Sequence, residues 1–298
     1  MNSFVNTIIK PDPRIYLMVT YFGSFPNYFQ LYLDSLSINT DILSVIIFTD
    51  IDTSMYQLPE NAIIINMTLD NIRERAACFL LDEYNTQIDS NLLIKRPYKL
   101  CDYKVVYHLL FCDILRNIGV NETDYIGWGD IDLIYGKLSN MINLKIDYSV
   151  IGFHGHFTAI KNNNDLKNLY SNINDLHTLL IDNGNHVIDE RQMRSELINF
   201  TTNTGRSRFI MNSYFADIIP PLFSNDMFKM TTKFKMTTNN KIINHIKFDK
   251  IIESLVVVFE DGSTKEVTYA HLQKRKMIYE FKEYNIFYIL KDRFSLTI

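Results

Sequence analysis

Cysteine, proline and glycine are all scarce in this chain of 298 residues, with 3, 7 and 10 copies respectively. Cys78, Cys101 and Cys112 show no CxxC spacing, so the pattern excludes a disulfide framework and a structural zinc site. They indicate reduced, mostly buried thiols in a cytoplasmic protein. The few prolines and glycines, with only moderate charge, exclude extensive disorder.

Long apolar runs and an excess of positive charge are also lacking. No run reaches the roughly 18 residues of a membrane helix, and residues 1–10 lack the pattern of a secretory signal. The formal net charge of -4 gives no bulk attraction to nucleic acid. We therefore expect neither a transmembrane segment nor a nucleic-acid partner. Hydrophobic residues make up 47% of the chain, which is ample for a packed core.

The first half of the chain alternates between apolar strand-like runs and amphipathic helical patterns. The strands are expected at residues 14–21, 43–49, 62–66 and 124–128, with helices at 28–37 and 68–81. Uninterrupted apolar strands separated by helices are typical of a parallel sheet covered on both faces. The sequence therefore predicts an α/β fold with a mainly parallel central sheet and flanking helices.

Further local signals predict the remaining elements. Asp102 is expected as the N-cap of a helix that continues to Gly119, and residues 134–141 as a short helix. Residues 161–175 are expected to form a polar surface stretch. The Asp-Gly dipeptide within residues 254–268 predicts a β-hairpin in a small C-terminal extension.

Two aspartates, Asp130 and Asp132, follow the expected strand at residues 124–128. Ligands bind beyond the carboxyl ends of strands in an open parallel sheet, and Asp50 also falls at such an end. Mg²⁺ and Mn²⁺ prefer oxygen ligands, usually one or two carboxylates with substrate phosphates. The pattern thus predicts a metal site for a diphosphate, although a short Asp-x-Asp motif also occurs by chance in caps and turns.

A second group of candidates lies near the end of the chain. His271 could add an imidazole ligand to manganese, and Lys274 could neutralise a leaving diphosphate. Their three-residue spacing would place both on one side of a turn. The alternatives are a histidine without a ligand role and a solvated basic run at residues 274–276.

Asp102 and Lys104 form a third candidate pair, at the start of an expected helix. Backbone N–H groups at a helix start favour anions, and Asp102 could also accept from sugar hydroxyls. A plain N-cap role explains Asp102 equally well.

Four segments occur in an order that resembles a known family. They are YKLCDYK (98–104), GDIDLIYG (129–136), the Asp-Glu pair at 189–190, and YAHLQKRKM (269–277). The chain resembles a family of bacterial and viral glycosyltransferase-like proteins often encoded near polysaccharide synthesis genes. That family in turn resembles the GT-A nucleotide-sugar transferases, which have a Rossmann-like fold and a DxD metal motif. The chain departs from the family pattern after Lys104, where Val105 stands in place of the usual proline.

The resemblance implies roles for the metal and diphosphate residues. Asp132 would be the firmer metal ligand, and Asp130 would contact the metal through water or else contact the ribose. His271 would complete the ligand set of Mn²⁺ or Mg²⁺, and Lys274 would hold the diphosphate.

The resemblance also implies where the donor and acceptor lie. Asp50 would sit near the base, with Tyr21 or Phe22 close by. The donor sugar would contact residues of the YKLCDYK segment, namely Asp102 and either Lys99 or Lys104. The catalytic acid or base would be Asp189 or Glu190, beneath the transferred sugar or near the acceptor.

The implied function is metal-dependent transfer of a hexose from a nucleoside-diphosphate sugar, most simply a UDP-sugar, to a glycan or other hydroxyl acceptor. Residues 1–220 would form the GT-A catalytic domain, and residues 221–298 an extension completing the metal site within one structural unit. A homodimer is compatible with these expectations. A viral source would place the protein in the host cytoplasm or the virion. The alternatives are a catalytically silent nucleotide-sugar-binding module and a metal-dependent sugar-phosphate nucleotidyltransferase.

Overall fold

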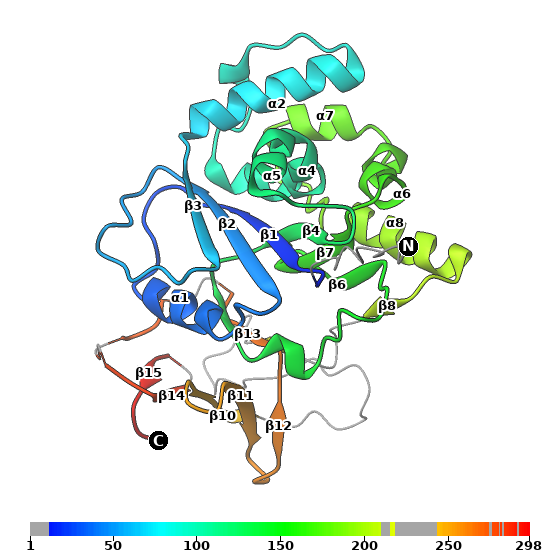
Figure 1. Cartoon of the computed structure of the whole chain (residues 1–298). Coiled ribbons are helices and arrows are strands. Elements are labelled where there is room, and N and C mark those ends of the chain that lie inside the picture. The colour runs from blue at the N-terminus through cyan, green and yellow to red at the C-terminus, as the bar shows by residue number, and fades with distance from the viewer. Residues whose placement is uncertain are drawn as a thin grey trace, which may run out of the picture.

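A computed structural model describes residues 12–209, 215–217, 243–273, 276–279, 281, 283–290 and 292–298 (Figure 1). Its largest sheet has seven strands in the order β3-β2-β1-β4-β7-β6-β8. The strands are β1 (Ile15–Thr20), β2 (Leu43–Thr49), β3 (Ala62–Asn66), β4 (Tyr125–Gly129), β6 (Val150–His154), β7 (Phe157–Lys161) and β8 (Arg208–Phe209).

This sheet is mostly parallel. Strands β3, β2, β1 and β4 run parallel to one another, whereas β7 runs antiparallel to both β4 and β6. All seven residues of β2 are buried, as expected for a strand covered on both faces. The prediction of a mixed α/β fold with a mainly parallel central sheet is confirmed.

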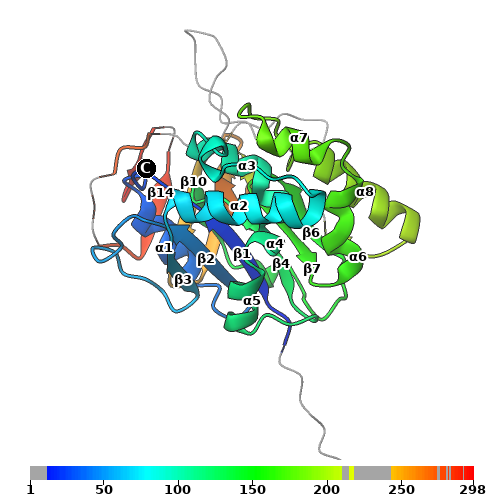
Figure 2. The ribbon, with the colours of Figure 1, turned by 90° about the horizontal axis from the view of Figure 1, so that it is seen from above.

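Helices cover both faces of the large sheet (Figures 1 and 2). Alternate residues of β1 point to opposite faces, so Leu17 packs with α1 residues and Met18 packs with α2 residues. The helices are α1 (Phe29–Ser37), α2 (Leu69–Tyr84), α3 (Leu100–Tyr103), α4 (Tyr107–Leu110), α5 (Cys112–Ile118), α6 (Asn164–Lys167), α7 (Leu176–Ile181) and α8 (Gln192–Thr204). A capping box at Thr68 and Asn71 starts α2.

Helix α1 lies between the large sheet and the C-terminal strands. Phe29 and Leu33 belong to the core against the large sheet, whereas Leu31 packs with the C-terminal core. The C-terminal core includes a five-stranded sheet in the order β12-β11-β10-β14-β15. Its strands are β10 (Ile243–Asp249), β11 (Ser254–Phe259), β12 (Thr264–Glu266), β14 (Ile286–Ile289) and β15 (Phe294–Ser295). The hairpin predicted within residues 254–268 is confirmed as β11 and β12. The expected boundary near residue 220 lies outside the described residues.

A small third sheet joins distant parts of the chain. Strand β13 (Tyr269–His271) pairs antiparallel with β5 (Leu133–Tyr135) and parallel with β9 (Phe215–Asp217). His271 is the partner of Leu133, and the Leu272 amide donates to the Asp132 carbonyl at 2.8 Å. This pairing carries His271 to the end of β4, where the paired aspartates lie.

Three local predictions are wrong. Residues 134–141 contain the end of β5 and a 3-10 turn over Leu138–Asn140, because all of β5 is buried against β13. The expected helix from Asp102 to Gly119 is broken into α3, a 3-10 turn, α4 and α5. Residues 161–175 include α6 and a 3-10 segment, with Leu166 fully buried in the core.

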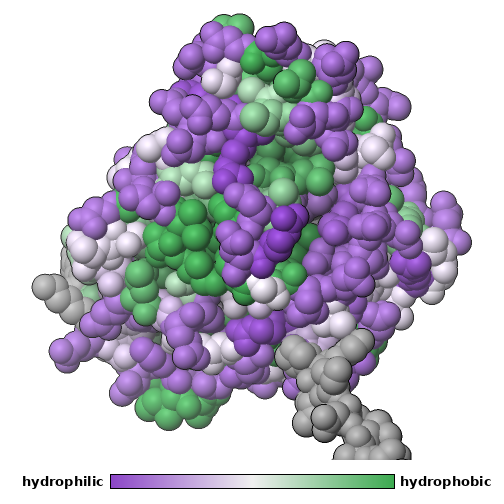
Figure 3. Space-filling view, turned by 45° about the horizontal axis from the view of Figure 1, so that its top comes forward, coloured by the Kyte–Doolittle hydropathy of each residue, from purple (hydrophilic) through white to green (hydrophobic). Residues whose placement is uncertain are grey.

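The surface also corrects one expectation. Cys78 and Cys112 are exposed and Cys101 is half-buried, so the thiols are not mostly buried. On the face shown in Figure 3, hydrophilic residues border a central area of apolar ones. Among the described helices, none combines the length and the apolar character needed to cross a membrane.

Candidate metal and substrate site

Three potential metal ligands meet at the carboxyl end of β4. Asp130 and Asp132 follow this strand directly, and His271 comes from β13. One ligand atom from each lies within 4.8 Å of the others, and His271 Nε2 is 3.7 Å from Asp132 Oδ2. Ligands at about 2.1 Å from an ion lie at most about 4.2 Å apart, so a small side-chain shift lets one ion reach all three. Two carboxylates and one imidazole are a donor set suited to Mn²⁺ and acceptable to Mg²⁺.

Lys104 connects this cluster to a second acidic position. Its Nζ donates to Asp130 Oδ1 at 2.8 Å and to the Gly155 carbonyl at 2.7 Å, and it lies 3.4 Å from Asp189 Oδ2. Burial by itself would lower the pKa of Lys104, but Asp130 and Asp189 outweigh it and hold the pKa well above its ordinary value. Lys104 therefore stays charged and neutralises part of the acidic site.

Asp189 is buried beside Lys104, with 4% of its surface exposed. Burial raises the pKa of Asp189 to about 6, with Asp130 and Glu190 adding to the rise and Lys104 opposing it. A carboxylate with a pKa near neutrality is suited to exchange protons with a substrate. Glu190, by contrast, is exposed.

Gly155 lets the two acids approach the turn between β6 and β7. A Cβ atom at Gly155 would lie 2.6 Å from Glu190 Cγ and 2.8 Å from Asp189 Oδ2. Any larger residue would therefore displace both acids, including Asp189 from its place 3.4 Å from Lys104.

Two further histidines lie behind the cluster and were missed by sequence reasoning. The His156 ring stacks on His271 with centroids 4.0 Å apart, and on His154 at 5.0 Å. Burial lowers the pKa of His156 well below its ordinary value, and the neighbouring His271, His154 and Lys104 lower it further. The His-Gly-His string at 154–156 was the available signal.

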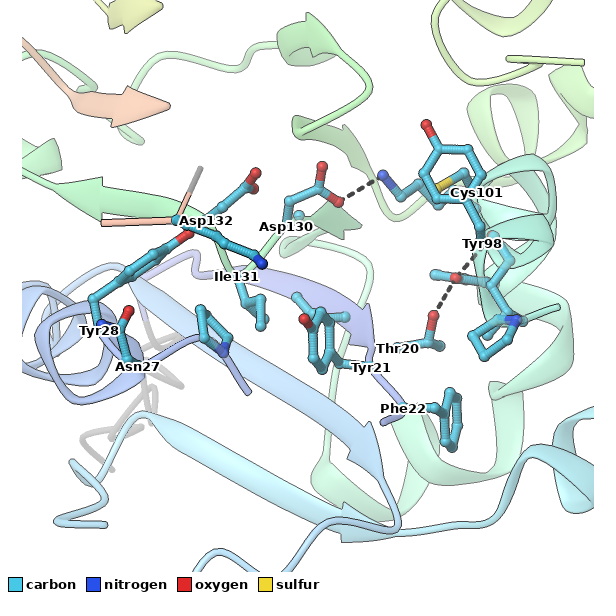
Figure 4. A pocket seen from close by; sticks show the side chains of 18 of the residues that line it. Thr20, Tyr21, Phe22, Asn27, Tyr28, Tyr98, Cys101, Asp130, Ile131 and Asp132 are labelled. Atoms are coloured by element: carbon cyan, nitrogen blue, oxygen red, sulfur yellow. Dashed lines mark hydrogen bonds and ion pairs between the residues drawn. The ribbon is translucent and has the colours of Figure 1, made fainter. Parts of the chain in front are cut away.

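A large cavity of about 550 Å³ opens on one side of the aspartates. Figure 4 shows Asp130 and Asp132 together at its edge, with the aromatic rings of Tyr21 and Phe22 across from them. Lys276 also lines this cavity. Its aromatic side chains are Tyr21, Phe22, Tyr28, Tyr98 and Tyr107.

A smaller cavity of about 210 Å³ lies on the other side and is lined mainly by polar residues. Asp189, Glu190 and His271 line it, together with Asn185 and Gln273. The two cavities share Tyr98, Cys101, Lys104, Asp130 and Asp132. The three candidate ligands thus stand between an aromatic cavity and an acidic one.

Four expected site residues need correction or fall outside the description. Asp102 and Lys99 are buried, with 0% and 3% exposed, and line neither cavity, so they are not placed to contact a donor sugar. Asp102 is not an N-cap either, since it lies within α3. Asp50 is exposed at the end of β2 and lines neither cavity, so it is not placed to contact a base there. Lys274 lies outside the described residues.

Residues 17–297 match DUF6625, a family of unknown function. The chain belongs to DUF6625. The DUF6625 match includes both the segment with Asp130 and Asp132 and the segment with His271. No curated protein sequence matches the chain.

Proposed function

We propose that this protein is a metal-dependent glycosyltransferase of the GT-A type, which transfers a hexose from a nucleoside-diphosphate sugar to a hydroxyl acceptor. One observation carries the proposal. Asp130 and Asp132 follow the parallel strand β4 and meet His271 of β13, and this cluster stands between a large aromatic cavity and a small acidic one. The end of a parallel strand is where ligands bind in open α/β sheets.

The large cavity is the proposed nucleotide site. Its volume of about 550 Å³ lies within the usual range for small-molecule sites, about 300–1,000 Å³. Tyr21 and Phe22 offer aromatic faces for a base, and Lys276 adds a positive charge near the phosphates. A UDP-sugar is the simplest donor for such a site.

Asp130, Asp132 and His271 are the proposed ligands of Mn²⁺ or Mg²⁺. The bound ion would supply Lewis-acid stabilisation of the charge that develops on the leaving diphosphate. Lys104 fixes one oxygen of Asp130 and so orients that carboxylate for the ion.

Asp189 is the proposed general base. The acceptor hydroxyl oxygen forms a bond to the anomeric carbon of the sugar, and its proton passes to the Asp189 carboxylate. The bond between that carbon and the diphosphate oxygen breaks, and its electron pair leaves with the diphosphate. A pKa of about 6 keeps Asp189 ionised at neutral pH while leaving it a useful proton acceptor.

A panel of nucleotide-sugars with and without Mn²⁺ tests the proposal. We expect at least one donor to raise the melting temperature and to release its nucleoside diphosphate, in both cases only with Mn²⁺. No response to UDP-glucose, UDP-galactose, UDP-N-acetylglucosamine or GDP-mannose would refute the transferase. Stabilisation without turnover on any acceptor would indicate a nucleotide-sugar-binding module, and formation of a nucleotide-sugar from a sugar phosphate would indicate a nucleotidyltransferase.

A further inference from the structure

A buried ion pair lies beside the small cavity without lining it. Lys99 Nζ donates to Asp102 Oδ2 at 2.9 Å, and the two side chains are 2% and 0% exposed. The same Nζ donates to the carbonyls of Leu179 at 2.6 Å and Gly184 at 2.8 Å. All three ammonium donors are thus engaged, two of them with backbone far away in the sequence.

Asp102 binds the same distant segment through its carboxylate. The amide of His186 donates to Asp102 Oδ2 at 3.0 Å, and the amide of Ile188 donates to Asp102 Oδ1 at 3.2 Å. Together, Lys99 and Asp102 hold the segment 184–188 at three backbone positions. We call these two side chains the clamp.

The clamp encloses a strained residue. Val187 lies between the two amides that Asp102 accepts and has a φ of +54°, which is rare for a β-branched side chain. Strain of this kind persists only where the surroundings enforce it. Here the hydrogen bonds on either side of Val187 supply that constraint.

The clamped segment leads directly into the small cavity. Asn185 and Val187 line that cavity, and so do Asp189 and Glu190, which follow immediately. The Ile188 amide bonded to Asp102 belongs to the residue just before Asp189. A shift of this backbone would therefore move Asp189 away from its place 3.4 Å from Lys104.

Stability alone is a weak reason for such a pair. Removing two charges from water is costly, and apolar residues of similar size are often as stabilising as a buried ion pair. A charged pair can, however, hold several backbone groups in one defined arrangement. The clamp does this for the segment that carries the acids.

We propose that Lys99 and Asp102 are positioning residues, which set the place of Asp189 and Glu190 in the small cavity by holding residues 184–188. This role rests on the proposed function, because it assigns the acids to the transfer reaction. The metal ligands lie on β13 and just after β4, so the clamp does not hold them.

The test uses the full chain and Asp102→Asn, which leaves one acceptor but removes the charge. The amides of His186 and Ile188 should exchange with deuterium faster than in the wild type, as measured residue by residue. The four nucleotide-sugars named above are assayed one at a time. For each donor that the wild type turns over, kcat should fall by about 100-fold with little change in KM, as expected for a misplaced catalytic group. Binding of Mn²⁺ alone, followed by its paramagnetic resonance signal, should be unchanged.

Two variants separate positioning from loss of folding. Asp102→Asn leaves Lys99 as an unpaired buried charge, and the double variant Lys99→Met/Asp102→Asn removes that charge. The double variant should regain melting temperature but keep the fast exchange and the low kcat. Asp70→Asn is the matched control, because Asp70 pairs with Arg73 at the same i,i+3 spacing but is 70% exposed. This control should leave exchange and kcat unchanged.

The outcomes are distinct. Unchanged exchange at His186 and Ile188 in Asp102→Asn overturns the clamp, and so does a kcat that returns together with melting temperature in the double variant. A wild-type protein that neither binds Mn²⁺ nor turns over any donor overturns the proposed function instead. In that case the exchange rates still decide whether the clamp holds the segment.

Discussion

Lys99 and Lys104 lie close together in the chain and are both buried, yet the structure uses them differently. Lys99 pairs with Asp102 in the adjoining helix α3 and otherwise bonds to backbone carbonyls. Lys104 pairs with Asp130 and Asp189, which come from distant segments, and it lines both cavities. Residue type and burial are alike, so the partners and the access to a cavity distinguish a positioning lysine from one within the site.

The two lysines also differ in what their charge serves. The Lys99 charge is balanced by one carboxylate, and the rest of its bonding fixes backbone. The Lys104 charge is shared between two acids, one a proposed metal ligand and the other the proposed base. A change at Lys104 should therefore affect metal, base and stability together.

Lys104→Met should have the largest effect. Breaking a buried ion pair by removing one partner typically costs about 3–5 kcal/mol, because the remaining charges stay buried. We expect the free energy of unfolding in urea to fall by about that amount, with loss of turnover. Lys145→Met, at an exposed position, should change the free energy by less than about 0.5 kcal/mol. Equal effects of the two variants would contradict the role of Lys104.

Asp132→Ala should have the second-largest effect. Together with its control, this variant compares two acids that each follow a strand. Loss of a ligand should weaken Mn²⁺ binding by at least about 100-fold, since even loss of an outer-sphere partner costs 10–100-fold. The stabilisation that a ligand at 100 times its Kd provides, about 2.7 kcal/mol, should also disappear.

Asp50→Ala is the matched control for this prediction. Asp50 also follows a parallel strand but is exposed and lines neither cavity. Its removal should leave the titration of Mn²⁺, followed by thermal shift, unchanged. A loss of Mn²⁺ binding in this control, or full binding in Asp132→Ala, would refute the assigned ligands.

Gly155→Ala should reduce turnover with a smaller loss of stability. The added Cβ would meet the Glu190 side chain at 2.6 Å, and a flexible side chain can move away. Displaced acids should lower kcat by about 10–100-fold. Gly136→Ala is the opposite case, because its Cβ would meet the Val267 carbonyl at 2.5 Å. It should lower the melting temperature more than Gly155→Ala, so measuring kcat and melting temperature for both variants separates site from scaffold.

The pH dependence should show the smallest effect. The raised pKa of about 6 means that Asp189 is ionised, and able to accept a proton, only above that value. A plot of log kcat/KM against pH, which follows groups of the free enzyme, should be flat above about 6 and fall tenfold per unit below it. Asp189→Asn should abolish this limb, whereas Glu190→Gln should retain it. The reverse pattern would assign the base to Glu190.

Much of the large sheet could be predicted because its signals are local. Apolar runs such as Leu43–Thr49 show buried strands directly, and Asp130 follows such a run. Residues 134–141 were misread because the partner of β5 is β13, far away in the sequence. Burial in that sheet overrides the local preference, and no local pattern reports it.

Only part of the candidate site could be predicted from the sequence, for the same reason. Asp130, Asp132 and His271 carry distinctive chemistry, and their convergence could be expected from a resemblance. Lys99 and Asp102 were misassigned because polar residues in a motif look alike whether they contact a ligand or hold backbone. The stacking of His156 on His271 could not be predicted, since it joins the turn between β6 and β7 to β13, which belongs to another sheet.

The sequence by itself determined the alternation of strands and helices, the paired acids at the end of a strand, and the hairpin near the end of the chain. These features depend on periodicity and on neighbours within a few residues. Only the tertiary structure decided that β13 pairs with β5, that Lys104 joins Asp130 to Asp189, and that Lys99 and Asp102 hold residues 184–188. Each of these depends on which groups meet when distant segments bury their apolar surfaces together, and on the buried polar groups then finding partners.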